Sequence, residues 1–207
     1  MESAGETIVS PINEDFHKSL ACYCFSNLEH FLTHKKMQDY ASTLDTQQHP
    51  LFVTYYLDGR LRGCIGTFKP DMLGKTLQSY SIIAAIKDHR FPPIQLKEVP
   101  HLTCEVSILS QFEKIAHPLD WEVGKHGIEI EFSGEDVCET YRGTYLPQVA
   151  KEQGWDQRTT LESLLKKAGY YGGNLESVME RFKMVRRYQS EKRGITYSEY
   201  KELTYKV

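Results

Sequence analysis

The stretch Leu61-Arg-Gly-Cys-Ile-Gly66 decides how the rest of the chain is interpreted. Its cysteine has a glycine directly before it and another glycine two positions after it, within a run that resembles an apolar strand. A glycine inside a strand costs stability and leaves no side chain to pack, so it usually marks a bulge or the close approach of another backbone or a ligand. The hexapeptide therefore predicts the edge of a site, but it does not identify the reaction or the ligand.

The residues on either side of the hexapeptide predict a β-hairpin. Residues 50–57 form the first predicted strand, Asp58-Gly59 is a favoured two-residue hairpin turn, and the return strand covers residues 60–68. Pro70-Asp71 is expected to end it. Because side chains two apart in a strand share a face, Arg62 is expected about 7 Å from Cys64 on the same side.

The remaining elements mix helices with strands, which predicts an α+β or α/β class. Apolar residues at helical spacing, together with proline and glycine near the ends, predict helices over residues 10–36, 76–88, 147–153 and 196–205. A further helix is predicted to start at a Thr159–Glu162 capping box and to end at Gly169. Strands are predicted over 102–109, 121–123, 127–132 and 136–145, with a loop at 111–120, whereas 175–187 fits either a helix or a strand.

Length and composition limit the possible classes of protein. A chain of 207 residues suits one domain, or one domain with an inserted lobe, and a net charge of −3 lacks the basic excess of a dedicated nucleic-acid binder. No apolar run is long enough for a membrane helix, and the first residues lack the order of a signal peptide. Five irregularly spaced cysteines indicate an intracellular, reducing setting, with cytoplasm and nucleus both open.

Five sequence blocks together resemble the AMMECR domain family. They are Leu61–Phe68, Lys87–Pro93, Leu119–Ile128, Tyr145–Asp156 and Arg187–Glu191. The second block has His89 where relatives more often have Ser or Pro, and the fifth has Gln189 where Arg is common. The resemblance extends from about the first predicted helix to the last.

The resemblance implies a two-lobed α+β fold. A larger α/β lobe comes from both chain ends, a smaller antiparallel β lobe comes from the middle, and the hexapeptide lies at a cleft between them. One AMMECR domain over residues 10–206 and a flexible segment at 1–9 are expected. In many microbes the family is encoded beside, or fused to, a dioxygenase-like protein called Memo, together with a radical-SAM enzyme, which makes a Memo-like protein a candidate partner.

Cys64 is the first candidate catalytic residue. As a nucleophile it would need a depressed pKa, from a cation such as Arg62 or from a helix N-terminus, and a base such as His89, His101 or His126. Alternatively, the cysteine is a small apolar side chain held between glycines that serve packing. The sequence leaves both interpretations open.

The other candidate residues line the same predicted cleft. A bidentate arginine near glycine amides can bind a carboxylate or phosphate, or it can form an ion pair between the lobes. His126 is a candidate acid or base, whereas the simpler interpretation of its block is a tight turn with Trp121 in the core. The predicted ligand-binding or partner-binding residues are Arg62, Gly63, Ile65, Gly66, Asp88, Arg90, Trp121 and Glu122.

Two further patterns favour structural explanations. His30 and His34 have the spacing of a zinc pair on a helix but lack a third ligand, so we expect no metal and no cofactor. The basic segment 181–193 interleaves aromatic residues with Lys and Arg, but it is short and the chain is mildly acidic, so we do not expect nucleic-acid binding.

These observations leave three functional hypotheses. The first is a binding or accessory subunit that presents the cleft to a partner protein or a small anionic ligand. The second is an enzyme that uses Cys64 in a modification pathway with Memo-like and radical-SAM proteins. The third is an RNA-associated protein. The sequence does not decide whether the protein is an enzyme. We favour the binding subunit because the sequence shows no assembled catalytic triad, no metal cluster and no nucleotide-binding loop.

Overall fold

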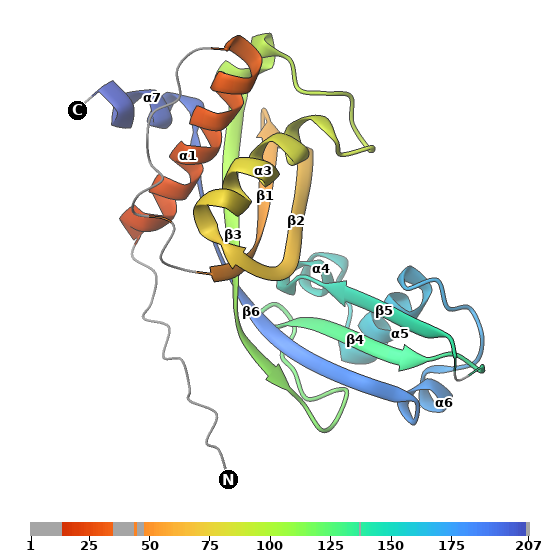
Figure 1. Cartoon of the computed structure of the whole chain (residues 1–207). Helices are drawn as coiled ribbons and strands as arrows, with labels where there is room; N and C mark the ends of the chain where they lie inside the picture. Colours follow the sequence, from red (N-terminus) through yellow and green to blue (C-terminus); the bar gives the residue numbers. More distant parts are fainter. Residues whose placement is uncertain (1–13, 35–43, 45–47, 137, 206–207) are drawn as a thin grey trace. The chain divides into compact units, whose positions relative to one another are not determined.

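The chain forms two compact units of mixed helix and strand (Figure 1). The computed structural model describes residues 14–34, 44, 48–136 and 138–205. Unit 1 takes the described residues of Met1–Ile108 and Lys192–Val207, and unit 2 is built from Leu109–Glu191. This division confirms the prediction of one lobe from both chain ends and another from the middle, while the expected flexible segment at 1–9 lies outside the described residues.

Unit 1 packs two helices on a sheet. Strand β1 lies between β2 and β3, antiparallel to both, and α1 and α3 cover the face that carries Leu51, Val53 and Tyr55. These three side chains are fully buried because they occupy alternate positions of one strand. The elements of unit 1 are α1 (Glu14–Thr33), β1 (Gln48–Leu57), β2 (Arg60–Met72), α3 (Leu73–Ile86), the 3-10 helix η1 (Leu96–His101), the start of β3 (Leu102–Lys114), the end of β6 (Phe182–Thr196) and α7 (Tyr197–Tyr205).

The predicted hairpin is confirmed, but its second strand is longer than expected. Asp58 and Gly59 both have positive φ, at 49° and 76°, as the mirror-image hairpin turn requires. The prediction that Pro70-Asp71 ends the strand is wrong, because β2 pairs with β1 as far as Met72. Among the described residues β2 is the edge strand of the sheet, so the missing N–H of proline breaks no ladder there.

Unit 2 is an antiparallel sheet with three short helices. Strand β4 lies between β5 and β6, and the buried side chains of this sheet pack against α5. The elements of unit 2 are the end of β3, β4 (Gly127–Ser133), β5 (Thr140–Tyr145), α4 (Pro147–Gln153), α5 (Gln157–Lys167), α6 (Leu175–Met179) and the start of β6. The ambiguous segment 175–187 contains both predicted forms, a short helix followed by a strand.

Three local predictions in the second half of the chain are wrong. Residues 121–123 form a turn instead of a strand, and β3 continues to Lys114 where a loop was expected, with a positive φ of 51° at Gln111. The N-cap of α5 lies three residues earlier than predicted, at Asp156, whose carboxylate accepts the N–H of Thr159 at 2.7 Å.

Candidate functional site

The two glycines of the hexapeptide make room for the protein's own chain. A Cβ atom on Gly63 would lie 2.1 Å from the carbonyl oxygen of Ala84 in α3, and one on Gly66 would lie 2.4 Å from the ring of Phe52 in β1. Neither approach is possible for a real side chain. The close contact that these glycines predict is therefore made by the helix and strand beside β2, and Ile65 packs against the core of unit 1.

Arg62 is held inside unit 1 by four hydrogen bonds. Its Nε and Nη2 atoms donate to the carboxylate of Glu98 at 2.9 and 3.1 Å, and the carbonyl oxygens of Pro92 and Pro93 accept from Nη1 and Nη2 at 2.7 and 3.3 Å. The side chain is largely buried. Its guanidinium therefore anchors the segment after α3 to β2, and an anion there would have to compete with these bonds.

Asp88 and Arg90 form a clasp on Cys64. Asp88 accepts the backbone N–H of Cys64 at 2.9 Å, and Nη2 of Arg90 donates to the Cys64 carbonyl at 3.2 Å. The two side chains are also ion-paired, and the guanidinium of Arg90 holds the pKa of Asp88 well below its usual range. The clasp lies on the side of β2 away from β1. There it hydrogen-bonds to the backbone N–H and carbonyl of Cys64, as a neighbouring strand would.

The thiol of Cys64 is not activated for nucleophilic attack. Burial raises its pKa above the usual value, and the hydrogen bond from Thr54 at 3.2 Å and the charge of Arg90 do not outweigh that effect. The cation that acts on the thiol is therefore Arg90 and not Arg62. A protonated thiol is a weak nucleophile, so the catalytic role of Cys64 stays a prediction that the geometry does not support.

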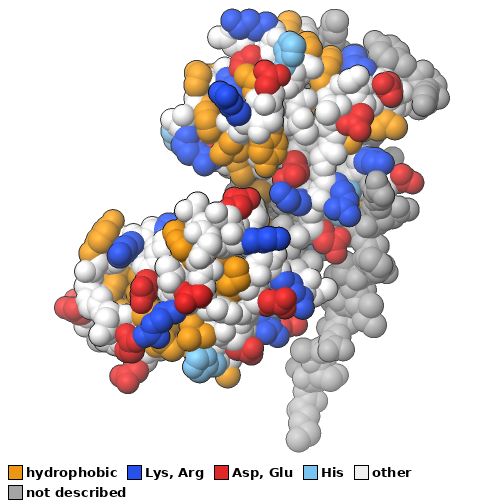
Figure 2. All heavy atoms as spheres, turned by 180° about the vertical axis from the view of Figure 1, so that it is seen from behind, with side chains coloured by type: hydrophobic (Ala, Val, Ile, Leu, Met, Phe, Trp, Pro, Cys, Tyr) orange, Lys and Arg blue, Asp and Glu red, His pale blue; other side chains and the backbone are white. Residues whose placement is uncertain are grey.

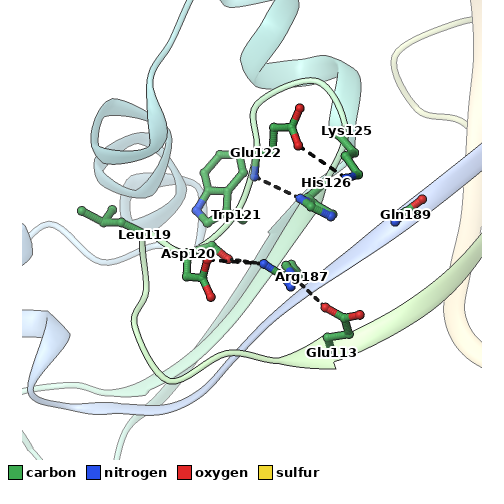
Figure 3. A pocket seen from close by; sticks show the side chains of 9 residues that line it. All are labelled: Glu113, Leu119, Asp120, Trp121, Glu122, Lys125, His126, Arg187 and Gln189. Carbon is green, nitrogen blue, oxygen red and sulfur yellow. Dashed lines mark hydrogen bonds and ion pairs between the residues drawn. The ribbon is translucent and has the colours of Figure 1, made fainter. Parts of the chain in front are cut away.

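The block around Trp121 forms a tight turn in unit 2. The carbonyl oxygen of Glu122 accepts the backbone N–H groups of Lys125 and His126, at 3.2 and 2.9 Å, and Gly124 supplies a φ of 84°. Trp121 is buried in the core of unit 2, as the simpler interpretation of this block predicted. The turn places Glu122 and His126 side by side at the surface of a pocket (Figure 3).

His126 is fixed as a neutral hydrogen-bond donor. Its Nδ1 atom accepts the backbone N–H of Glu122 at 3.0 Å, so the proton of the neutral ring lies on Nε2. Burial, together with the charges of Arg187 and Lys125, lowers the pKa of the imidazole. Only 9% of the residue is exposed, and Nε2 has no hydrogen bond within the described part of the chain.

The pocket in unit 2 has a volume of about 410 Å³ and a polar lining. Arg187, on β6, donates from Nε to the carboxylate of Glu113 at 2.7 Å and from Nη1 to the backbone carbonyl of Asp120 at 2.9 Å (Figure 3). Three segments contribute: the end of β3, the turn and β6. The lining residues are Glu113, Leu119, Asp120, Trp121, Glu122, Lys125, His126, Arg187 and Gln189.

Sequence reasoning found three of these residues, Trp121, Glu122 and His126, but missed the contribution of β6. Arg187 and Gln189 are two apart in a strand and so share a face, which was the available signal. Arg187 was considered instead as part of the basic segment 181–193. The register that places it opposite Ile128 is a long-range pairing that spacing does not reveal.

Two arginines in the middle of the basic segment 181–193 are ion-paired with acidic neighbours. Arg186 is ion-paired with Glu129, and Arg187 is ion-paired with Glu113 and Asp120. On the face of the molecule shown in Figure 2, acidic and basic side chains are interspersed. A nucleic-acid groove needs uncompensated cations along its length, so these pairs oppose the RNA hypothesis.

The predicted site residues thus form two groups, one in each unit. Those in unit 1 are Arg62, Gly63, Cys64, Ile65, Gly66, Asp88 and Arg90, and those in unit 2 are Trp121, Glu122 and His126. Each group is built within its own unit, and the cleft between the lobes stays a prediction. Within the described residues, no three His, Cys, Asp or Glu side chains gather as a metal site, and no helix has the length and apolarity that crossing a membrane requires.

Comparison with known proteins agrees with the five sequence blocks. A family model described as AMMECR1 matches residues 21–193. The chain belongs to the AMMECR1 family. It is 41% identical over 189 residues to an uncharacterized protein of Arabidopsis thaliana, covering 89% of this chain and 87% of that one. An uncharacterized protein of Schizosaccharomyces pombe is 44% identical over 188 residues, covering 88% and 94%.

A solved structure supports the same fold for this AMMECR1 family member. The crystal structure of an uncharacterized protein from Pyrococcus horikoshii matches with a TM-score of 0.71 and 28% sequence identity. The match covers 87% of this chain and 92% of the archaeal chain. These relatives establish family and fold, and their descriptions name no activity, ligand or partner.

Proposed function

We propose that the protein is a binding or accessory subunit that contacts its partner through the pocket of unit 2. The observation that carries this proposal is the state of His126, a nearly buried side chain with an unused Nε2–H donor at a polar pocket. Solvent reaches this Nε2–H, so an acceptor from a partner can replace water there without breaking a bond within unit 2.

The candidate groups of unit 1 support a structural role by contrast. The guanidinium of Arg62 is bonded to Glu98, and the Asp88–Arg90 clasp is bonded to the backbone of Cys64. An enzyme that used Cys64 would need a thiolate at neutral pH, and burial acts in the opposite direction. Docking is therefore a better explanation than independent catalysis.

The partner that we propose to test is a Memo-like protein, which the family resemblance names. Isothermal titration calorimetry of the full chain against purified Memo-like protein would measure the affinity. The pocket variant would be Gln189→Ala, because this lining side chain makes no hydrogen bond within the described residues of unit 2, and Cys64→Ser would be the matched control in unit 1.

We expect the wild-type chain and Cys64→Ser to bind alike, and the pocket variant to bind about tenfold more weakly, as the loss of about 1.4 kcal/mol of contact would produce. A binding loss confined to Cys64→Ser would contradict the proposal and favour the enzyme hypothesis. A wild-type chain that did not bind would remove the Memo-like protein as the partner.

A further inference from the structure

The pocket of unit 2 has more negative than positive charge. Its lining contains three carboxylates, from Glu113, Asp120 and Glu122, and two cations, from Lys125 and Arg187. Both cations are already paired with these carboxylates. The three acidic side chains are 54%, 67% and 67% exposed, so each has a solvated oxygen available for an incoming positive charge.

His126 provides an independent indication of a ligand at the same pocket. More than nine-tenths of this residue is buried, and its Nδ1 is occupied by the backbone N–H of Glu122. Nε2 lies on the other side of the ring, at the pocket wall, and carries a proton with no acceptor among the described residues (Figure 3). A neutral N–H donor at that position matches a neutral acceptor, such as a backbone carbonyl.

Building on the proposed function, we propose that the pocket receives an extended segment of a partner protein that carries a lysine or arginine. A backbone carbonyl of that segment accepts the Nε2–H of His126, and the basic side chain pairs with the carboxylates of Glu122 and Asp120. Gln189 offers an amide that can both donate to and accept from the backbone of the segment.

The size and charge of the pocket favour this occupant over other ligands. A volume of about 410 Å³ falls within the roughly 300–1,000 Å³ of pockets that enclose small ligands, so it suits a few residues of peptide. A phosphate or carboxylate would meet three acidic groups and find the guanidinium of Arg187 already bound on two sides. Nucleic acid is disfavoured for the same reason.

Nuclear magnetic resonance of the full, 15N-labelled chain can test this assignment with defined peptides. The probes are acetyl-Gly-Lys-Gly-amide, its glutamate counterpart and its norleucine counterpart, each added at millimolar concentration. We expect the lysine peptide to shift amide signals of residues 119–126 and 187–189, the norleucine peptide to shift them more weakly, and the glutamate peptide to leave them unchanged.

Three variants separate the charge contact from the carbonyl contact. Glu122→Gln keeps the backbone turn and is expected to raise the Kd of the lysine peptide about threefold, the effect of one exposed ion pair. His126→Phe removes the donor and is expected to raise it about tenfold, whereas His126→Gln keeps an acceptor and a donor and is expected to restore most of the affinity.

The proposal would be overturned if the glutamate peptide bound as tightly as the lysine peptide, or if the lysine peptide shifted signals elsewhere in the chain. It would also be overturned if no peptide shifted any signal while the Memo-like protein still bound through the pocket in calorimetry. In that last case the proposed function would stand and only the basic segment would be wrong. Failure of both experiments would remove the pocket as a binding site.

Discussion

The strand β2 of unit 1 and the pocket of unit 2 use the same kinds of side chain in opposite ways. In β2 and the segment after α3, Arg62, Asp88 and Arg90 bond to partners inside the unit and leave the Cys64 thiol protonated. In the pocket, the imidazole of His126 keeps a donor unused at the surface.

This difference shows that an unusual sequence is not by itself a ligand site. Two glycines and an arginine around a cysteine are what a tightly packed edge strand needs when a helix backbone crosses it at Gly63. The pocket of unit 2 has a less distinctive sequence, because its residues come from three separate segments. Four experiments test this contrast, beginning with the variant expected to cost the most stability.

The largest effect is expected from a side chain at Gly63. Gly63→Val would place carbon atoms against the carbonyl oxygen of Ala84, and the resulting overpacking should lower the free energy of unfolding by about 3 kcal/mol or more. Urea denaturation followed by circular dichroism would measure the change. Gly59→Asn is the control, since its positive φ suits asparagine, no other atom lies within 4 Å of its added Cβ, and stability should change by less than about 1 kcal/mol. If the valine variant were as stable as the control, β2 would not be packed as described.

Loss of the Asp88 carboxylate should have the next largest effect. Asp88→Ala leaves the backbone N–H of Cys64 and the guanidinium of Arg90 without this acceptor, which should cost about 1–3 kcal/mol of stability. Because the folded-state pKa of Asp88 is depressed, its contribution is complete above the unfolded value of about 3.9 and is lost as the pH falls through the folded value.

The acid side of the stability curve therefore provides a second measurement. Asp88→Asn keeps an acceptor for Cys64 but cannot titrate, so its free energy of unfolding should decrease less steeply than that of the wild type below about pH 4. Equal acid slopes in chemical denaturation would show that the Asp88–Arg90 clasp does not depend on charge.

Thiol labelling should order the cysteines by exposure and pKa. Cys138 is exposed and should react first, while Cys64 should react more slowly because burial raises its pKa. Cys22, whose pKa burial raises to about 11, should react only when the protein opens. Mass spectrometry after timed labelling between pH 6 and 9 would report the order, and preferential labelling of Cys64 would support the enzyme hypothesis instead.

The smallest effect is expected in the titration of His126. Its imidazole should take up a proton below the ordinary value of about 6.5, since burial and two neighbouring cations disfavour the charged ring. Nitrogen-15 chemical shifts would show the proton on Nε2 above that range. A midpoint above 6.5, or a proton on Nδ1, would remove the neutral donor from the pocket.

Local sequence rules predicted most of the elements of this fold. Backbone preferences that operate over a few residues explain three of these features. They are the hairpin turn at Asp58-Gly59, the start of α4 at Pro147 and the glycine at position 169 that follows the C-terminal end of α5. Errors occurred where tertiary pairing overrides such preferences, as at Pro70, which an edge strand tolerates. Asp156 was missed because Thr159 begins a competing capping pattern.

The candidate site was less predictable than the fold, for a physical reason. Alternation predicted that Arg62 shares a face with Cys64, but it could not show that Glu98, thirty-six positions away, takes up the guanidinium. The same limit applies to Arg187, whose bond to Glu113 joins residues seventy-four positions apart. Such pairings depend on the register of long-range strands, which a single sequence does not encode in its spacing.

The clasp on Cys64 has a consequence for how this protein behaves at high concentration. An open sheet edge is a template on which another polypeptide can add, and natural proteins obstruct such edges with charges, bulges or prolines. Here two side chains and the nearby Pro70 perform that task for β2, without an additional strand. Acid that protonates Asp88 would thus do more than weaken unit 1: it would uncover backbone groups able to recruit neighbouring molecules into aggregates.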